Sequence, residues 1–313
     1  MLHLIADVGG TNIRFAAIEG TMRAAAQALM AGSFAQTRSY EWAEVGDLLN
    51  ALQTFREDMG LPKKVTGLTL AIAGPVLDHM AEFRLTNRTT PFTRAQLSQH
   101  ADQVRIINDF AAQAAVIPLL TEEDLDVLKP GQVQPGARAV LGPGTGLGVA
   151  GLGPQGQVFA GEGGNVTVPY LSTAPWSALE GQISGGRLRA EDVFSGQGLE
   201  NIFAAQTGQR LAAEAISAAA HTGDDQALAA MQLFFDFAAA LCADQALQYG
   251  AAGGVFLVGA IMQKNRDLLD RDRFAQQFSN IRTHREFLTH IPVYQVTKPT
   301  SGLAGVAAYE AAC

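Results

Sequence analysis

Residues 4–18 read LIADVGGTNIRFAAI, two short β-type runs on either side of a turn that contains adjacent glycines. The runs at residues 4–6 and 13–18 predict two strands joined by that turn. Because Gly9 and Gly10 have no Cβ atom, backbone N–H groups of the turn can approach a phosphate group. An ordinary hairpin turn with an acidic residue beside it has the same pattern, so this turn needs a partner before it indicates a nucleotide site.

A partner with the same design lies in the middle of the chain. Residues 137–141 and 148–152 predict two further strands, separated by the Gly-Pro-Gly-Thr-Gly turn at residues 142–146. A P-loop would need Gly-Lys-Ser/Thr, and a dinucleotide fingerprint would need glycine where Leu147 stands. Since neither turn contains lysine, phosphate charge must be met by backbone amides, hydroxyl groups and a metal ion. The repeat predicts two half-molecules that could hold one polyphosphate.

Length and composition limit the kinds of protein this can be. A chain of 313 residues exceeds the size at which a single core keeps growing, which favours two packed lobes. Thirty acidic against 22 basic side chains, a net charge of −8, match nucleic acid and anionic lipid poorly. The apolar runs are shorter than the roughly 20 residues of a membrane helix, and two cysteines make no disulfide framework. We therefore expect a cytoplasmic protein with a small-molecule substrate and neither a nucleic-acid nor a membrane partner.

Strands and helices alternate along most of the chain. A helix is predicted over residues 44–59 and a strand over 68–72. A strand at 104–107 runs directly into Asn108-Asp109 and an alanine-rich helix. A buried helix around residues 228–242 then precedes a strand at 255–258. This alternation favours an α/β class with a mixed sheet in each lobe.

Taken together, these segments resemble the bacterial glucokinases, within the superfamily that includes actin, hexokinase and Hsp70. The two glycine turns match the phosphate-1 and phosphate-2 motifs of that superfamily, and residues 253–259 (GGVFLVG) match its adenosine motif. Further matches are LTNRT (85–89), IINDF (106–110), GEGG (161–164), SGQGL (195–199) and GLAG (302–305). The matching segments follow one another in the family's order over nearly the whole chain.

The resemblance implies a two-lobed ribonuclease H-like fold with mixed sheets and a central cleft. Its small α/β domain would comprise residues 1–108 plus 302–313, and its large α/β domain residues 109–301. The implied activity is ATP-dependent phosphorylation of glucose at the 6-hydroxyl, with Mg²⁺ as cofactor and a homodimer as the assembly. No zinc is expected, because the cysteine-rich motif of the related ROK-type sugar kinases is absent from the sequence.

The resemblance also implies a role for individual residues. Asp109 would be the general base that takes the proton from the attacking sugar hydroxyl. The residues implied to bind the sugar are Asn87, Asn108, Asp109, Glu162, Asn165 and Glu191. Those implied to bind the nucleotide are Asp7, Gly9, Gly10, Thr11, Asn12, Arg14, Gly144, Thr145, Gly146 and Gly259. Asp7 would in addition hold magnesium through water, since hard cations prefer carboxylate oxygen.

Simpler explanations exist for several of these residues. An Asp before a helix is commonly its N-cap, which would suffice for Asp109, and the Asn87 segment could be a plain turn. Asn165 stands where many glucokinases carry a histidine, and Ala260 stands where glycine is frequent. Asn165 leaves open a kinase for another hexose or an amino sugar. A non-catalytic sugar sensor is a second alternative, because the superfamily includes such proteins, and an actin-like ATPase, which would share the phosphate turns, is a third.

Overall fold

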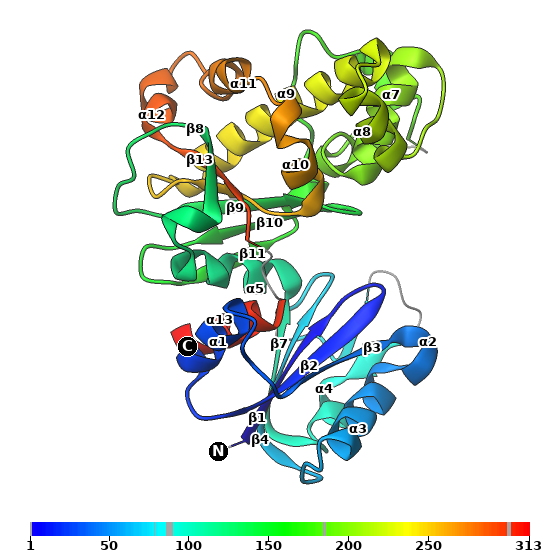
Figure 1. Ribbon diagram of the computed structural model, residues 1–313, viewed down its shortest axis with the longest axis vertical. Helices are drawn as coiled ribbons and strands as arrows, with labels where there is room; N and C mark the ends of the chain where they lie inside the picture. The colour runs from blue at the N-terminus through cyan, green and yellow to red at the C-terminus, as the bar shows by residue number, and fades with distance from the viewer. Residues whose placement is uncertain (1, 78, 86–89, 184–185, 299–301) are drawn as a thin grey trace. The chain divides into compact units, whose positions relative to one another are not determined.

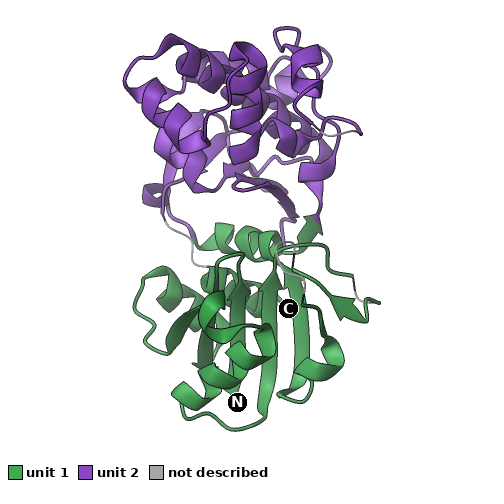
Figure 2. Cartoon of the chain, turned by 90° about the vertical axis from the view of Figure 1, so that its right-hand side faces the viewer, with its two compact units in different colours: residues 1–119, 156–160, 299–313 green, residues 120–155, 161–298 purple. Residues whose placement is uncertain are grey.

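The structure is a computed structural model, which describes residues 2–77, 79–85, 90–183, 186–298 and 302–313. The chain divides into two compact units (Figure 2). Unit 1 comprises residues 1–119, 156–160 and 299–313, and unit 2 comprises residues 120–155 and 161–298. Each unit has its own sheet and its own apolar core.

The sheet of unit 1 is built outward from the predicted hairpin. Its five strands have the order β3-β2-β1-β4-β7, in which β1–β2 and β2–β3 are antiparallel pairs and β1–β4 and β4–β7 are parallel (Figure 1). The strands are β1 (Leu2–Val8), β2 (Asn12–Glu19), β3 (Thr37–Glu41), β4 (Val65–Ile72) and β7 (Ala101–Asn108). Val8 pairs with Ile72, and Ile72 pairs with Asn108. The carboxyl ends of the three parallel strands therefore meet at one edge, where the first glycine turn and Asp109 follow.

Helices cover both faces of this sheet. On one face α3 packs into the core through Phe55, whose ring stacks on Phe15 with 5.1 Å between centroids. On the other face α13 packs on β1, α1 and α5 (Figure 1). The helical segments are α1 (Met22–Met30), α2 (Trp42–Val45), α3 (Leu48–Asp58), α4 (Arg94–Leu97), α5 (Asp109–Val116), η1 (Ile117–Leu119) and α13 (Gly302–Ala312), and a small hairpin adds β5 (Glu82–Phe83) and β6 (Phe92–Thr93).

The helix predicted over residues 44–59 is two helices in the structure. Gly46 ends α2 with a φ of 74°, a left-handed conformation that glycine adopts without a Cβ penalty. Asp47 then caps α3, because its carboxylate accepts the N–H of Asn50 at 2.9 Å. The apolar periodicity continues across this break, which is why it predicted one helix.

The boundary of unit 1 also differs from the expected division after Asn108. The unit runs on through α5 to Leu119, because α5 packs closely against α13. A Cβ at Gly305 of α13 would lie 2.4 Å from the carbonyl oxygen of Ala112 in α5, so the two helices meet at backbone distance. Asp109 therefore belongs to the same unit as the first glycine turn.

The second sheet, which is built mainly from unit 2, repeats the design of the first. Its order is β11-β10-β9-β12-β13-β8, with β9–β10 antiparallel and β9–β12 and β12–β13 parallel. The strands are β8 (Leu125–Lys129), β9 (Arg138–Pro143), β10 (Leu147–Leu152), β11 (Val158–Gly161), β12 (Val255–Leu257) and β13 (Val293–Val296). In each unit an antiparallel hairpin around a glycine turn is continued by two parallel strands. The predicted α/β class with a repeated half-molecule is confirmed.

One long helix forms the centre of unit 2. It is α9 (Asp225–Tyr249), which packs against β9 and four other helices, and its phenylalanines 234, 235 and 237 are buried. By length and composition α9 could cross a membrane, which the sequence reading did not anticipate, but 78% of its most apolar window is buried within the structure. The remaining helical segments are η2 (Glu122–Asp124), η3 (Gly163–Asn165), α6 (Trp176–Glu180), η4 (Ala190–Asp192), α7 (Gly196–Thr207), α8 (Ala213–His221), α10 (Ala260–Asn265), η5 (Arg266–Leu268), α11 (Arg271–Phe278) and α12 (Arg285–His290).

Candidate active site

The first glycine turn joins β1 to β2 and is closed by backbone hydrogen bonds. The N–H of Gly9 donates to the carbonyl of Asn12 at 3.0 Å, and a Cβ at Gly9 would lie only 3.1 Å from that oxygen. From outside the turn, the indole N–H of Trp42 donates to the carbonyl of Gly9 at 2.9 Å. Gly10 and Thr11 at the tip are exposed. These hydrogen bonds fix the turn and leave its tip exposed, as a phosphate-binding turn requires.

Asp7 is the acidic residue beside this turn. Its side chain is 19% exposed, and Arg14 on the paired strand donates to it at 3.3 Å. Burial raises the pKa of Asp7 above its usual range, and the charge of Arg14 only partly offsets that effect. A largely buried carboxylate that is costly to leave ionised gains stability from a cation, which fits the predicted magnesium role.

Asn108 and Asp109 lie where β7 passes into α5. The N-cap of α5 is Asn108, whose Oδ1 accepts the N–H groups of Phe110 at 2.8 Å and Ala111 at 3.2 Å. Its Nδ2 donates to the carbonyl of Gly74 at 3.1 Å. The alternative that made Asp109 the cap is therefore wrong: Asp109 is the first helical residue, and its Oδ1 accepts the Phe110 N–H at 2.9 Å. Since Asn108 caps α5, the helix does not need Asp109 as its N-cap.

The second glycine turn joins β9 to β10 in unit 2. The N–H of Gly144 donates to the carbonyl of Gly146, and the N–H of Gly196 donates to that of Gly144, both at 2.8 Å. Gly259 follows β12 with a φ of 104°, and a Cβ there would lie 2.8 Å from the carbonyl oxygen of Pro143. Both Gly259 and the first turn of α7 therefore lie against the second glycine turn. The predicted residues Gly144, Thr145, Gly146 and Gly259 are brought together.

The predicted sugar acceptors of unit 2 form one cluster with an arginine. Nδ2 of Asn165 lies 3.5 Å from Oε2 of Glu162, and Oδ1 of Asn165 accepts from Nη1 of Arg189 at 3.0 Å. The same Nη1 lies 2.5 Å from Oε1 of Glu191. The other carboxylate oxygen of Glu191 faces Gly146, where a Cβ would approach it to 2.8 Å. The acceptors are thus placed beside the second glycine turn.

Close backbone packing explains how these residues come together. A Cβ at Gly164 would lie 2.1 Å from the carbonyl oxygen of Leu147, so η3 can rest directly on β10. A bridge between Thr167 and Arg189 then joins the segment after η3 to the start of η4. Residues almost thirty positions apart in sequence therefore share one surface next to the turn.

Not every predicted site residue can be placed. Within unit 1 the structure groups Asp7, residues 9–12, Arg14, Asn108 and Asp109 around the carboxyl edge of the sheet. Asn87 lies outside the described residues. Sequence reasoning missed Arg189 and Trp42. A cation two positions before a predicted acceptor was the available signal for Arg189, whereas Trp42 carried no local signal.

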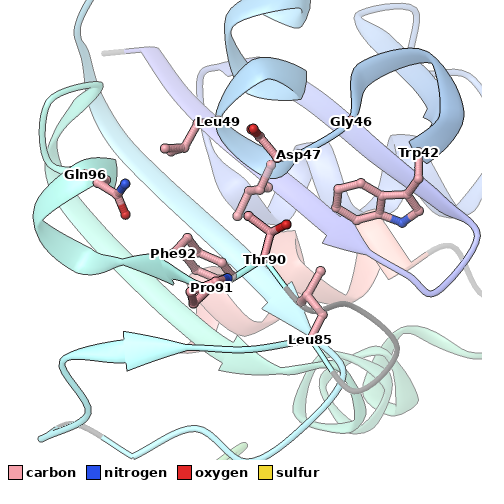
Figure 3. A pocket seen from close by; sticks show the side chains of 10 residues that line it. Trp42, Gly46, Asp47, Leu49, Leu85, Thr90, Pro91, Phe92 and Gln96 are labelled. Carbon is pink, nitrogen blue, oxygen red and sulfur yellow. The ribbon is translucent and has the colours of Figure 1, made fainter.

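Trp42 also forms one wall of a pocket in unit 1 (Figure 3). The pocket has a volume of about 180 Å³, and the residues that line it are Trp42, Gly46, Asp47, Leu48, Leu49, Leu85, Thr90, Pro91, Phe92 and Gln96. Two of its polar side chains are already used by the fold, since Asp47 caps α3 and Gln96 accepts the N–H of Thr93. None of these lining residues belongs to the predicted sugar or nucleotide sets. The link between this pocket and the site is Trp42, whose indole N–H donates to the carbonyl of Gly9.

Comparison with known proteins identifies one family. A family model described as Glucokinase matches residues 4–312. A glucokinase of Chromohalobacter salexigens is 32% identical, over 96% of this chain and 95% of the relative. The resemblance inferred from the sequence motifs is confirmed.

Solved structures agree in fold. The crystal structure of a glucokinase from an Antarctic psychrotroph superposes with a TM-score of 0.81 at 30% identity, covering 98% of each chain. A glucokinase from Balamuthia mandrillaris, determined in complex with glucose, has a TM-score of 0.79 at 20% identity, covering 99% of this chain and 93% of that one. At 20% identity the latter likeness shows the fold alone. The expected two-lobed kinase fold is confirmed.

Proposed function

This chain belongs to the glucokinase family, and we propose that it transfers the γ-phosphoryl group of ATP to the 6-hydroxyl of glucose. The observation that carries the proposal is the contact between Glu191 and the second glycine turn. A Cβ on Gly146 would lie 2.8 Å from Oε2 of Glu191, so the carboxylate lies directly against the turn. A sugar acceptor built against a phosphate-binding turn is what phosphoryl transfer to a hydroxyl requires.

Asp109 is the proposed general base. It is the first residue of α5, and the N–H of Phe110 donates to one of its oxygens. Since the transition state of phosphoryl transfer is loose, the proton leaves the hydroxyl late and a carboxylate is basic enough to accept it. Asn108 contributes by fixing the start of α5, and thereby the position of its neighbour.

The nucleotide is assigned to the two glycine turns, together with Gly259. In this assignment backbone N–H groups of the turns and the hydroxyls of Thr11 and Thr145 bind phosphate oxygens. Asp7 is the residue that would hold Mg²⁺ through water, and the ion would neutralise charge on the transferring phosphoryl group. Arg14, half exposed beside Asp7, adds a positive charge next to the first turn.

The sugar is assigned to Glu162, Asn165 and Glu191, with Asn108 and Asn87 as further members of the predicted set. Carboxylates accept hydrogen bonds from sugar hydroxyls and discriminate well, because a polar group that the wrong sugar covers but leaves unpaired is costly. A cytoplasmic homodimer is part of the same proposal and rests on the family resemblance. Light scattering of the purified chain would test the dimer.

A coupled assay of ADP release tests the function. Glucose, mannose, fructose, N-acetylglucosamine and N-acetylmannosamine would each be supplied with Mg-ATP, and we expect the highest kcat/KM with glucose. Asn165, which replaces the usual histidine, makes a preference for another sugar of the panel the second candidate. Absence of turnover with every sugar would overturn the proposed function.

A further inference from the structure

Arg189 is held in place by Asp192, which is not one of the predicted sugar-binding residues. Its Nε and Nη2 donate to the two carboxylate oxygens of Asp192 at 3.2 and 2.8 Å. Its own backbone N–H donates to Asp192 as well, at 2.8 Å. Asp192 is buried, so this pairing fixes the plane of the guanidinium group.

The anchored plane leaves Nη1 to serve two predicted sugar acceptors at once. Nη1 lies 3.0 Å from Oδ1 of Asn165 and 2.5 Å from Oε1 of Glu191. These two residues come from η3 and η4, which are separated in sequence by a segment that contains α6. One nitrogen of Arg189 therefore sets the spacing between them.

The contact also decides which end of the Asn165 amide faces away from Arg189. A guanidinium group has only N–H donors, so the amide must turn its oxygen toward it. The NH₂ group is then on the side of Glu162, at 3.5 Å. Asn165 consequently offers a sugar a donor, while Glu162 and Glu191 offer acceptors.

We propose that Arg189 is a positioning residue of the sugar site, which holds Asn165 as a hydrogen-bond donor and Glu191 as an acceptor in one fixed arrangement. The inference rests on the proposed function and deepens it by naming the group that orders the sugar contacts. Lysine could not replace it, because a single ammonium group cannot grip Asp192 with two nitrogens while a third serves Asn165 and Glu191.

The test compares Arg189→Ala, Arg189→Lys and Asn165→Ala, the double variant Arg189→Ala/Asn165→Ala, and Arg187→Ala as a matched control. Arg187 is exposed and two positions away, so its removal changes net charge equally. For both Arg189 variants we expect the KM for glucose to rise about tenfold or more, the scale of one charge-assisted hydrogen bond. The kcat and the KM for ATP should change by less than about twofold, because the lost interaction acts on sugar binding. Arg187→Ala should leave all three values unchanged.

Two further readouts separate positioning from mere structural support. The effects of Arg189→Ala and Asn165→Ala on the KM for glucose should be less than additive, because one residue acts through the other. Asn165→Asp keeps an oxygen facing Arg189 but removes the donor, so its Tm should be maintained while the KM for glucose rises. This variant and Arg189→Lys decide the question if Arg189→Ala does not fold.

The outcomes distinguish this inference from the proposed function. An unchanged KM for glucose in Arg189→Lys and Arg189→Ala, with normal wild-type turnover, overturns the role of Arg189 and leaves the kinase activity standing. A lower Tm of the Arg189 variants, with equal losses in every kinetic constant, likewise overturns the role of Arg189 and leaves the kinase activity standing. A wild-type protein that neither binds nor phosphorylates any sugar of the panel, measured by calorimetry and by ADP release, overturns both.

Discussion

The carboxyl group of Asp7 lies directly against the α-carbon of Gly302, the first residue of α13. A methyl group at position 302 would be 2.2 Å from Cγ of Asp7 and 2.3 Å from its Oδ2. Such distances are far inside van der Waals contact, so glycine is required where the last helix of the chain meets the first glycine turn. The residue predicted to hold magnesium is thereby fixed by the opposite end of the chain.

Replacing Gly302 with Ala should displace Asp7. Alanine favours helix over glycine, so without this contact the substitution would leave the Tm unchanged or raise it. We instead expect a loss of about 1–3 kcal/mol of unfolding free energy, typical of overpacking, and a higher KM for Mg-ATP. Thermal melts and ATP titrations of the purified variant measure both effects.

The Asp7→Ala background provides the control for Gly302. Removing the carboxyl group makes room for the new methyl group, so Gly302→Ala should cost much less stability there than in the wild type. Equal losses of Tm in the two backgrounds would show that the cost arises elsewhere, for instance at the start of α13.

Asp109→Ala should remove turnover while leaving the fold intact. Asn108, and not Asp109, caps α5, so the substitution leaves the start of the helix in place. We expect kcat to fall by at least about 100-fold, the scale of a positioned proton acceptor, with a nearly unchanged Tm.

Asn108→Ala is the matched comparison for Asp109→Ala. It removes the cap and should cost about 1 kcal/mol of unfolding free energy or more. Near-normal kcat in Asp109→Ala, or a Tm that falls as far as in Asn108→Ala, would remove Asp109 from the mechanism.

Trp42→Phe should weaken ATP binding, although Trp42 is not one of the predicted nucleotide-binding residues. The substitution keeps an aromatic ring in the core but deletes the N–H that holds the carbonyl of Gly9 at 2.9 Å. Loss of one hydrogen bond of about 1 kcal/mol corresponds to roughly a fivefold higher KM for ATP, with the KM for glucose unchanged. Trp176→Phe is the control, since that indole also donates to a backbone carbonyl, that of Leu171, at 2.8 Å. A KM for ATP that does not distinguish the two variants would contradict the role of Trp42.

Acidification should destabilise unit 1 through His3. Its Nε2 lies 2.9 Å from Oγ1 of Thr69, which donates to Glu310 at 2.7 Å, while the ring packs on Gly67. Burial lowers the pKa of His3; the nearby charge of Glu310 opposes this shift, and Arg105 adds to it. The unfolded chain therefore binds the proton more tightly, and stability is lost as pH falls below the ordinary histidine value of about 6.5.

Urea unfolding between pH 5 and 7.5 measures this effect. The slope due to one histidine cannot exceed about 1.4 kcal/mol per pH unit. His100 also has a lowered pKa, because of burial and Arg56, so the comparison with His3→Gln is needed to isolate His3. Wild type and His3→Gln with the same pH dependence would exclude His3 as the origin.

Several elements could be predicted because the pattern that specifies them is local. The hairpin around Gly9 and Gly10, its repeat around residues 144–146 and the buried helix α9 all follow from the spacing of apolar residues and glycines. The junction at Asn108-Asp109 was predicted in the same way. Where the prediction differed, as at Gly46, the periodicity on the two sides of a break happened to stay in register.

Motif order was enough to indicate the family and the chemistry, since a glycine turn or an acidic residue after a strand is visible in a few consecutive letters. The contacts of Asp7 with Gly302, of Trp42 with Gly9 and of Arg189 with Asn165 are different in kind. They join segments that meet only once strand order and helix packing are established, and no local spacing encodes them. Which side chains support the site, and how tightly, is therefore a property of the folded chain.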